Sequence, residues 1–238
     1  MSSSIGARSG NFNSIANSKR SGWKTSLSLL RGAFGSSPQV ENLYDSPAGG
    51  LIIDTELSFD AKKVYFAMPN SGGAYRLWEL SEGGEARQIS PDDGVDVDHA
   101  DPCLLPDGNF IFASTATFLG MPCINGGPRM ASLYRLDVKE QKIRQLGFDQ
   151  DTSWYPTLQH DGRVIYTRWD YTDMVHSNNR PIVVMNPDGS GQRPYMFTNS
   201  YFPASFFFAR PVPGQPSAMV GIASGHHGVA RMGRMLLV

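Results

Sequence analysis

Hydrophobic and polar residues alternate in short runs along this chain, and the runs recur in a fixed order from about residue 51. Apolar stretches rich in Val, Ile, Phe and Tyr at 64–67, 110–113 and 164–167 each follow a polar turn. Two of these turns contain Asp-Gly, which supplies the positive φ angles that a tight hairpin needs. Runs of this length and composition are typical of β-strands. The pattern therefore predicts an all-β chain built from antiparallel hairpins.

The hairpins form a repeat in which each unit reads as strand, turn, strand, variable loop, strand, polar turn and strand. Units cover about residues 51–90, 102–146 and 154–197, and a further unit covers about 203–238. Their spacing of about 50 residues matches that of propeller blades. A closed propeller has about four to eight blades, each burying both faces against its neighbours. We therefore expect residues 46–238 to form a partial β-propeller, with three four-stranded blades and part of a fourth. This count favours a fragment of a longer protein over completion by a second copy.

Residues 1–45 differ in composition from the repeats. The first 40 residues hold five Lys or Arg and no Asp or Glu, in a background rich in Ser, Gly and Asn. Such a stretch is typical of a disordered leader, and an organelle transit peptide is the less favoured interpretation. The apolar patch at 27–30 is shorter than the ~7–15 residue core of a secretory signal. No signal peptide is therefore visible.

The charge and the composition of the chain argue against some classes of binding partner. The net charge of -1 argues against broad electrostatic binding of nucleic acid. No apolar run approaches the ~18–20 residues that a membrane-spanning helix needs. The two cysteines, Cys103 and Cys123, are too few for a disulfide framework. We expect a protein partner or a small ligand on the propeller loops, and neither nucleic acid nor a membrane span.

A set of motifs in residues 95–238 carries a family resemblance. They are Asp-Pro-Cys-Leu-Leu-Pro-Asp-Gly at 101–108, Gly-Met-Pro-Cys at 120–123, Trp-Tyr-Pro-Thr at 154–157, Asp-Gly-Arg-Val-Ile-Tyr-Thr-Arg-Trp at 161–169 with Tyr-Thr-Asp at 171–173, Met-Asn-Pro-Asp-Gly-Ser-Gly-Gln at 185–192, Ala-Arg-Pro-Val-Pro-Gly at 209–214 and Ser-Gly-His-His-Gly-Val at 224–229. Together these motifs resemble bacterial proteins related to the hydrazine synthase alpha subunit. The blade signature itself, Pro-Asp-Gly, an apolar strand, Leu-Tyr-x-x-Asp, a polar turn and an x-Gln-Leu ending, resembles the WD40-like repeats of TolB-type propellers.

The resemblance implies a propeller in a periplasmic or extracellular setting. Hydrazine synthases themselves are multihaem enzymes, and covalent c-type haem needs Cys-x-x-Cys-His, which this chain lacks. We therefore predict no covalent haem and no other cofactor in this chain. The expected function is a non-catalytic binding or scaffold module without an assigned catalytic residue. The alternative is a fragment of an oxidoreductase subunit whose redox centre lies outside this chain.

Two groups of residues are candidate metal ligands. His226 and His227 lie between glycines, in a turn where one imidazole can bind a metal while the other hydrogen-bonds to a carbonyl. Cys123 lies in a long Gly- and Pro-rich loop, and its thiolate suits zinc or copper. The favoured interpretations are structural: a strand-end turn for the histidines and a buried, inert thiol for the cysteine.

A second polar loop is a candidate ligand-binding surface. It contains Arg168, Trp169, Asp170, Tyr171 and Asp173. Aromatic rings beside arginine suit stacking against a sugar or a peptide. A network of salt bridges between blades explains the same residues equally well.

An acidic segment precedes the second blade. It contains Asp96, Asp98, His99 and Asp101. Oxygen ligands bind hard cations, but the segment lacks the glycine and the distal glutamate of a calcium loop. We therefore expect Asp101 to cap the turn into its blade through backbone hydrogen bonds.

Overall fold

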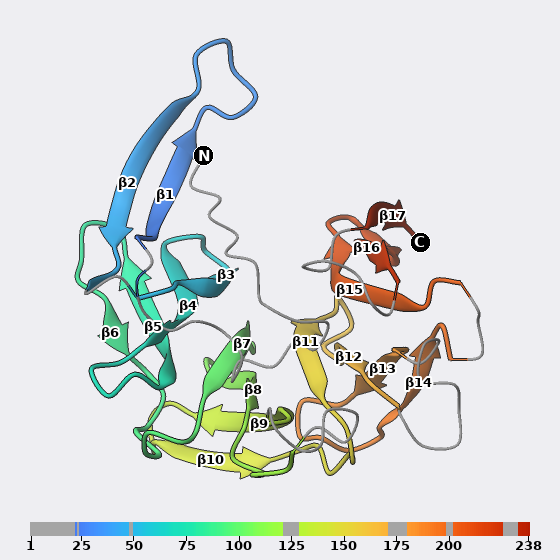
Figure 1. Ribbon diagram of the computed structural model, residues 1–238. Helices are drawn as coiled ribbons and strands as arrows, with labels where there is room; N and C mark the ends of the chain where they lie inside the picture. The colour runs from blue at the N-terminus through green and yellow to red at the C-terminus, as the bar shows by residue number, and fades with distance from the viewer. Residues whose placement is uncertain are drawn as a thin grey trace.

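The computed structural model describes residues 22, 24–47, 50–120, 129–170, 180–198, 202–225 and 233–238. Within these ranges the chain is built from antiparallel β-sheets that follow one another along the sequence. Four of the sheets are arranged as an arc around a common axis, and a long hairpin stands beside the first of them (Figure 1). The expected fold is confirmed: an all-β partial propeller.

Three blades have four strands each, and the described part of the fourth has three. Within every blade the strands pair in chain order, with the first strand innermost. The strands are β3 (Ile53–Leu57), β4 (Lys63–Pro69), β5 (Tyr75–Ser81) and β6 (Arg87–Gln88) in the first blade; β7 (His99–Leu104), β8 (Phe110–Ser114), β9 (Ser132–Asp137) and β10 (Lys142–Gln145) in the second; β11 (Ser153–Leu158), β12 (Val164–Arg168), β13 (Ile182–Met185) and β14 (Arg193–Met196) in the third; and β15 (Ser205–Val212), β16 (Gln215–Ser224) and β17 (Arg234–Leu237) in the fourth.

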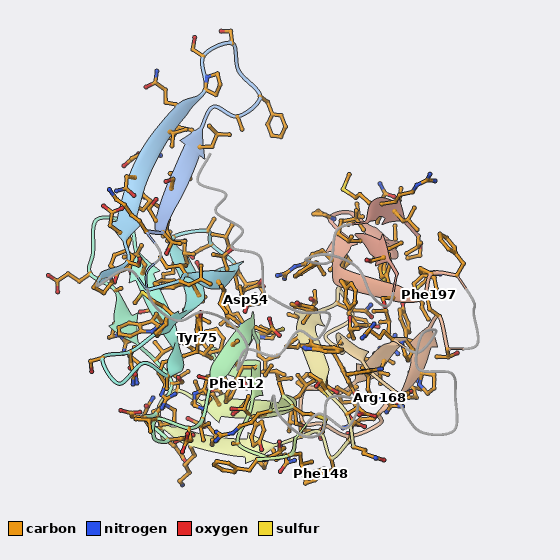
Figure 2. All side chains as sticks on the ribbon, viewed as in Figure 1. Asp54, Tyr75, Phe112, Phe148, Arg168 and Phe197 are labelled. Carbon is orange, nitrogen blue, oxygen red and sulfur yellow. The ribbon has the colours of Figure 1, made fainter. Side chains whose placement is uncertain are left out.

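The strands in the middle of the blades are apolar on both faces because each face packs against a neighbouring blade. In β8, Phe110 and Phe112 join the core between the first and second blades, while Ile111 and Ala113 join the core between the second and third. Figure 2 shows Phe112 among the side chains between these blades. Successive residues of a strand point to opposite faces, so a continuous apolar run is what a doubly covered sheet needs. The apolar run at 110–113 therefore reflects burial on both sides.

The long hairpin lies within the segment expected to be a disordered leader. Strands β1 (Ser26–Arg31) and β2 (Gln39–Asp45) pair antiparallel. Leu27 and Leu43 pack with Phe66 and Met68, on the face of the first blade opposite the second blade. Burial of these few apolar side chains against that face orders residues 26–45, an interaction that composition does not reveal.

Polar contacts lie at the base of this hairpin and at the loop end of its strands. The Thr25 hydroxyl donates to the Gly50 carbonyl at 2.8 Å and accepts from the Ile52 amide at 3.1 Å. Arg31 pairs with Glu41 across the hairpin at 2.6 Å and with Glu82 of the first blade at 2.7 Å. Arg31 and both glutamates are largely exposed, so these ion pairs contribute little to stability. The apolar contact is the main attachment of the hairpin.

Candidate functional site

The innermost strand of every blade carries the same irregularity. Its pairing with the next strand shifts register, once in the first three blades and twice in the fourth, which is the mark of a β-bulge. In each of these four strands one residue other than glycine adopts the left-handed conformation within a register shift: Asp54 (φ 53°), Asp101 (φ 51°), Tyr155 (φ 51°) and Phe208 (φ 55°). Such residues cost roughly 1–3 kcal/mol each and gather at functional sites. The repetition in four blades makes the bulge a feature of the architecture.

The four bulge residues and their neighbours line one cavity of about 270 Å3. All four inner strands contribute to its lining, and β3, β7, β11 and β15 face the middle of the arc (Figure 1). Asp54 lies on the inner strand of the first blade, close to this middle (Figure 2). Segments that are far apart in the sequence thus form one cavity, which we call the channel cavity.

An aromatic wall forms one side of the channel cavity. The rings of Tyr155 and Phe208 have their centroids 4.3 Å apart and are tilted by 44°. Tyr155 is buried, whereas 41% of Phe208 is exposed. The buried Phe207 ring also meets Tyr155 edge-on, with the two centroids 6.4 Å apart. The third and fourth blades therefore present an exposed ring that buried rings support.

Two aspartates also line the cavity. Asp54 comes from β3 and Asp101 from β7, and these two strands pack against each other. Asp101 is buried, and its carboxylate accepts a hydrogen bond from the Tyr155 amide at 3.3 Å. Asp101 therefore joins the second blade to the third at the cavity, which differs from the expected cap on its own blade.

One ion pair joins the first and fourth blades beside the cavity. Arg210 Nη1 lies 2.6 Å from Glu56 Oε2, although the two residues are 154 positions apart in the sequence. The Glu56 side chain is mostly buried, and this burial raises the pKa of its carboxyl, while the Arg210 guanidinium opposes the rise. Arg210 lines the cavity, so the positive charge there is already matched by Glu56.

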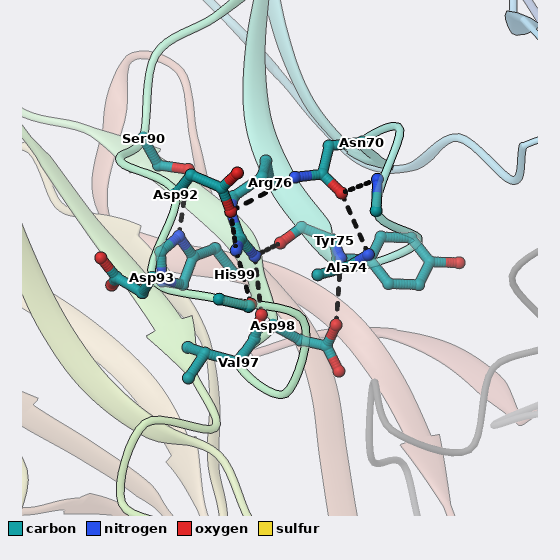
Figure 3. A network of polar contacts seen from close by, with 12 residues as sticks. Asn70, Ala74, Tyr75, Arg76, Ser90, Asp92, Asp93, Val97, Asp98 and His99 are labelled. Atoms are coloured by element: carbon teal, nitrogen blue, oxygen red, sulfur yellow. Dashed lines mark hydrogen bonds and ion pairs between the residues drawn. The ribbon is translucent and has the colours of Figure 1, made fainter.

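A second polar group lies between the first and second blades (Figure 3). Arg76 is fully buried, and its guanidinium donates to the carbonyls of Tyr75, Val97 and Gly94 at 2.6–2.8 Å. It also pairs with the Asp92 carboxylate at 2.6 Å. We call this group the Arg76 network. It fixes the segment that leads into the second blade.

The acidic segment takes part in the same network. The Asp98 carboxylate accepts from the Tyr75 amide at 3.0 Å. The buried His99 ring contacts the Ser90 hydroxyl through Nδ1 at 3.0 Å and lies 3.3 Å from Asp93 through Nε2. Burial lowers the pKa of His99, with Asp93 acting in the opposite direction. These contacts favour the structural role expected for this segment.

The predicted ligand surface of the third blade lies partly within the described residues. Arg168 pairs with Asp170 at 2.7 Å and with Asp149 at 3.3 Å. The Trp169 ring is buried and stacks on Trp154 at 6.4 Å between centroids, with an interplanar angle of 16°. The structure thus places Arg168 and Asp170 in a salt-bridge network and the Trp169 ring in the interior.

The remaining sequence-predicted site residues, Tyr171, Asp173, Cys123, His226 and His227, lie outside the described residues. Among the residues that the structure does describe, no group of three or more His, Cys, Asp or Glu is placed to hold a metal ion. The expected ligand surface and metal site thus stay predictions.

The cysteine of the second blade is unsuited to haem attachment. Cys103 is fully buried in β7, and burial raises the pKa of its thiol to about 12. A thiol with that pKa is a poor nucleophile and a poor metal ligand at neutral pH. The sequence also lacks Cys-x-x-Cys-His, and the expectation that this chain holds no covalent haem stays a prediction.

The channel cavity was not predicted from the sequence, although one signal pointed to it. Pro102 and Pro156 directly follow two of the bulge residues and lie within the inner strands. Proline cannot donate to the ladder, so inside a sheet it marks an edge or a bulge. Both prolines belong to motifs of the family resemblance, where they served only as markers of relationship.

Comparisons with known proteins support the fold. No family model and no curated protein sequence matches the chain. Hydrazine synthase of Kuenenia stuttgartiensis superposes with a TM-score of 0.65 at 17% identity, over 84% of this chain and 32% of that chain. A TolB-like protein of Agrobacterium tumefaciens gives 0.62 at 14% identity, over 88% and 73%. TolB of Acinetobacter baumannii gives 0.58 at 18% identity, over 89% and 48%.

These similarities confirm the resemblance to hydrazine synthase and TolB-type propellers at the level of the fold. This chain spans about a third of the length of the hydrazine synthase chain that it matches. Other propellers with a similar fold include a puromycin hydrolase and an oligogalacturonate lyase in complex with manganese. The same fold thus occurs in proteins with different activities, and function has to be argued from the site. No helix in the described ranges has the length and apolar character needed to cross a membrane.

Proposed function

We propose that this chain is a non-catalytic binding module of a hydrazine synthase alpha subunit-like protein, and that the channel cavity receives its ligand or a segment of a protein partner. One observation carries the proposal. Four inner strands converge on a cavity with an exposed Phe208 ring, and each strand keeps a left-handed residue there. A large ring that is partly exposed in a costly backbone conformation suits contact with a bound molecule.

The rigidity of the surrounding blades supports the same role. The cores on both sides of the second blade and the Arg76 network hold the inner strands in register. A binding site on such a scaffold needs little reordering when the ligand arrives, which reduces the entropic cost of binding. The cavity is also mixed in chemistry, with an apolar wall and a few polar groups, as ligand pockets usually are.

The proposal is tested by NMR on the full chain. Amide spectra are recorded during titration with small neutral, anionic and cationic fragments, and shifts are mapped on the four inner strands. Binding fragments should shift the amides of Thr55, Asp101 and Phe208, and Phe208→Ala should weaken this binding. The matched control is Phe148→Ala, because Phe148 is also exposed but lies outside the cavity. Binding that maps elsewhere, or no binding at all, would contradict the proposal.

The alternative is a fragment of an oxidoreductase subunit whose redox centre lies outside this chain. A different observation distinguishes it from the binding module. It requires a redox motif in the flanking part of the gene, such as Cys-x-x-Cys-His beyond Val238. Reading the flanking sequence therefore distinguishes a subunit fragment from a binding module, and the result does not depend on the NMR titration.

A further inference from the structure

We infer that the fourth blade pairs with the fourth blade of a second copy of this chain, through the face of its sheet that points away from the third blade. We call this surface the outer face, and it is formed by Val220, Ile222, Met235 and Leu237. The inference goes beyond the proposed function, because the outer face is a surface other than the channel cavity. It depends on the strand register, on exposure, and on what covers the other end of the arc.

The strand register places these four residues on one face of the blade. Met219 of β16 packs in the core between the third and fourth blades. Successive residues of a strand point to opposite faces, so Val220 and Ile222 point away from the third blade. In β17, Leu237 pairs with Val220 and Met235 pairs with Ile222. Directly paired residues share a face of the sheet, so all four belong to the outer face.

The outer face is apolar and open to solvent. In the third blade, Ile165 and Val184 pair across the second and third strands, and the fourth blade covers both completely. Ile222 and Met235 form the equivalent pair in the fourth blade, yet Met235 is 74% exposed and its neighbour Leu237 is 67% exposed. The outer face thus continues the series of apolar blade faces without the cover that the others have. A contiguous exposed apolar surface of this kind marks an interaction site.

The other end of the arc is already covered. The β1–β2 hairpin packs through Leu27 on the face of the first blade opposite the second blade. The outer side of this hairpin carries the exposed polar pair Ser28 and Asn42, while its apolar pair, Leu30 and Val40, lies next to the loop. A terminal cap occupies the place on which the next repeat would stack. A second copy therefore does not extend the arc head to tail, with its fourth blade on the first blade.

The outer face is suited to contact with itself. A two-fold interface brings the same residues of both copies together, and the four side chains of the outer face are uncharged, so no like charges meet and no charge loses its water. Arg210 pairs with Val220 along the strands, and Glu56 of the first blade holds its guanidinium at 2.6 Å. In such a dimer each copy keeps its own blades, so the pairing differs from completion of the ring.

The experiment measures the mass of the full chain in solution by analytical ultracentrifugation over a range of concentrations. We expect a monomer–dimer equilibrium in which the dimer is the largest species, because a two-fold interface occupies the outer face of both copies. Two double variants place charges on this face: Met235→Lys with Leu237→Lys, and Met235→Glu with Leu237→Glu. Each should raise the dimer dissociation constant at least about tenfold, because like charges would be buried against each other.

The matched control is Phe148→Lys. Phe148 is 79% exposed and lies in the link between the second and third blades, so its replacement should leave the dimer unchanged. Thermal unfolding of every variant shows whether it is folded. The replaced side chains of the outer face are largely exposed, so the unfolding temperature of the monomer should stay close to that of Phe148→Lys.

A mixture of the two double variants tests whether the outer face meets itself. In the mixed dimer the lysines of one copy lie against the glutamates of the other, and the like-charge repulsion is removed. An equal mixture should therefore form the dimer that each variant alone does not form.

Three outcomes would overturn the inference. They are a chain that stays monomeric up to roughly 0.1 mM, a dimer that both double variants retain, and a mixture that recovers no dimer. In the last case the outer face binds a different surface, and growth beyond the dimer would likewise indicate head-to-tail contact. The proposed function is tested separately, because the NMR titration follows the channel cavity and not the mass of the protein.

Discussion

The Arg76 network and the channel cavity both contain arginine and aspartate, but the two arginines differ in how deeply they are buried. Arg76 is fully buried and donates to several backbone carbonyls, whereas Arg210 is half-exposed and pairs with one glutamate beside a hollow. Asp98 accepts a backbone amide within a blade interface, while Asp54 lines a cavity of about 270 Å3. The Arg76 network specifies structure, whereas the proposed function assigns the groups around the hollow to contact with a ligand.

The two regions should differ most in the unfolding free energy that is lost when each arginine is replaced by alanine. Arg76→Ala would leave the carbonyls of Val97 and Gly94 without their guanidinium donors and should cost about 3 kcal/mol in the free energy of unfolding. Arg210→Ala removes a partly exposed pair and should cost about 1 kcal/mol or less. Urea unfolding followed by tryptophan fluorescence measures both. Equal losses would break the distinction between the two regions.

The network should also make stability depend on pH through His99. Burial holds the pKa of His99 below its ordinary value, so the unfolded chain binds a proton that the folded chain does not. Stability from this group is present above the ordinary histidine pKa and is lost as the pH falls below it, by up to about 1.4 kcal/mol per pH unit. Unfolding of the wild type and His99→Gln between pH 5 and about 8 tests this. Identical slopes for the two proteins would show that His99 does not contribute.

At the cavity, glycine should be better tolerated than alanine in place of Phe208. The left-handed backbone at this position disfavours any side chain, so Phe208→Gly should be about 1 kcal/mol more stable than Phe208→Ala. In an ordinary strand the order is reversed, by about 0.5–1 kcal/mol. Tyr195, a partly exposed residue of β14, serves as that reference. If alanine is better at both positions, the bulge is not strained.

The smallest expected effect concerns metals. We predict that the purified chain holds no stoichiometric zinc or copper, so treatment with a chelator should leave its unfolding temperature unchanged. Elemental analysis by mass spectrometry provides the measurement. Stoichiometric zinc or copper that is lost in His226→Ala or Cys123→Ala would instead support the metal site suggested by the sequence.

The repeat allowed most of the fold to be predicted from the sequence. The apolar run at 110–113 and the Asp-Gly turn before it identify a hairpin whose two faces are both buried, and the structure has this arrangement in β8. Two boundaries between ordered segments were harder to predict from the sequence. The second blade begins at His99 instead of near residue 102, and the hairpin at 26–45 orders by packing on Phe66 and Met68. Both depend on contacts between segments, which local patterns do not contain.

The candidate site could not be found in the same way. The sequence suggested that the Trp169 ring stacks against a ligand, yet this ring lies against Trp154 in the interior. Phe208 is one of three consecutive phenylalanines, and the sequence does not distinguish it from the other two, yet it is the exposed one. Residue type alone does not distinguish a buried ring from an exposed one, because exposure depends on the neighbouring blades.

The sequence by itself determined the strands, the hairpin turns and their repetition, because alternation and turn chemistry act over a few residues and recur in every blade. Only the tertiary structure decided that four bulges meet at one cavity and that Arg210 reaches Glu56. Those residues are brought together by the packing of whole blades about one axis, and no local preference encodes that meeting.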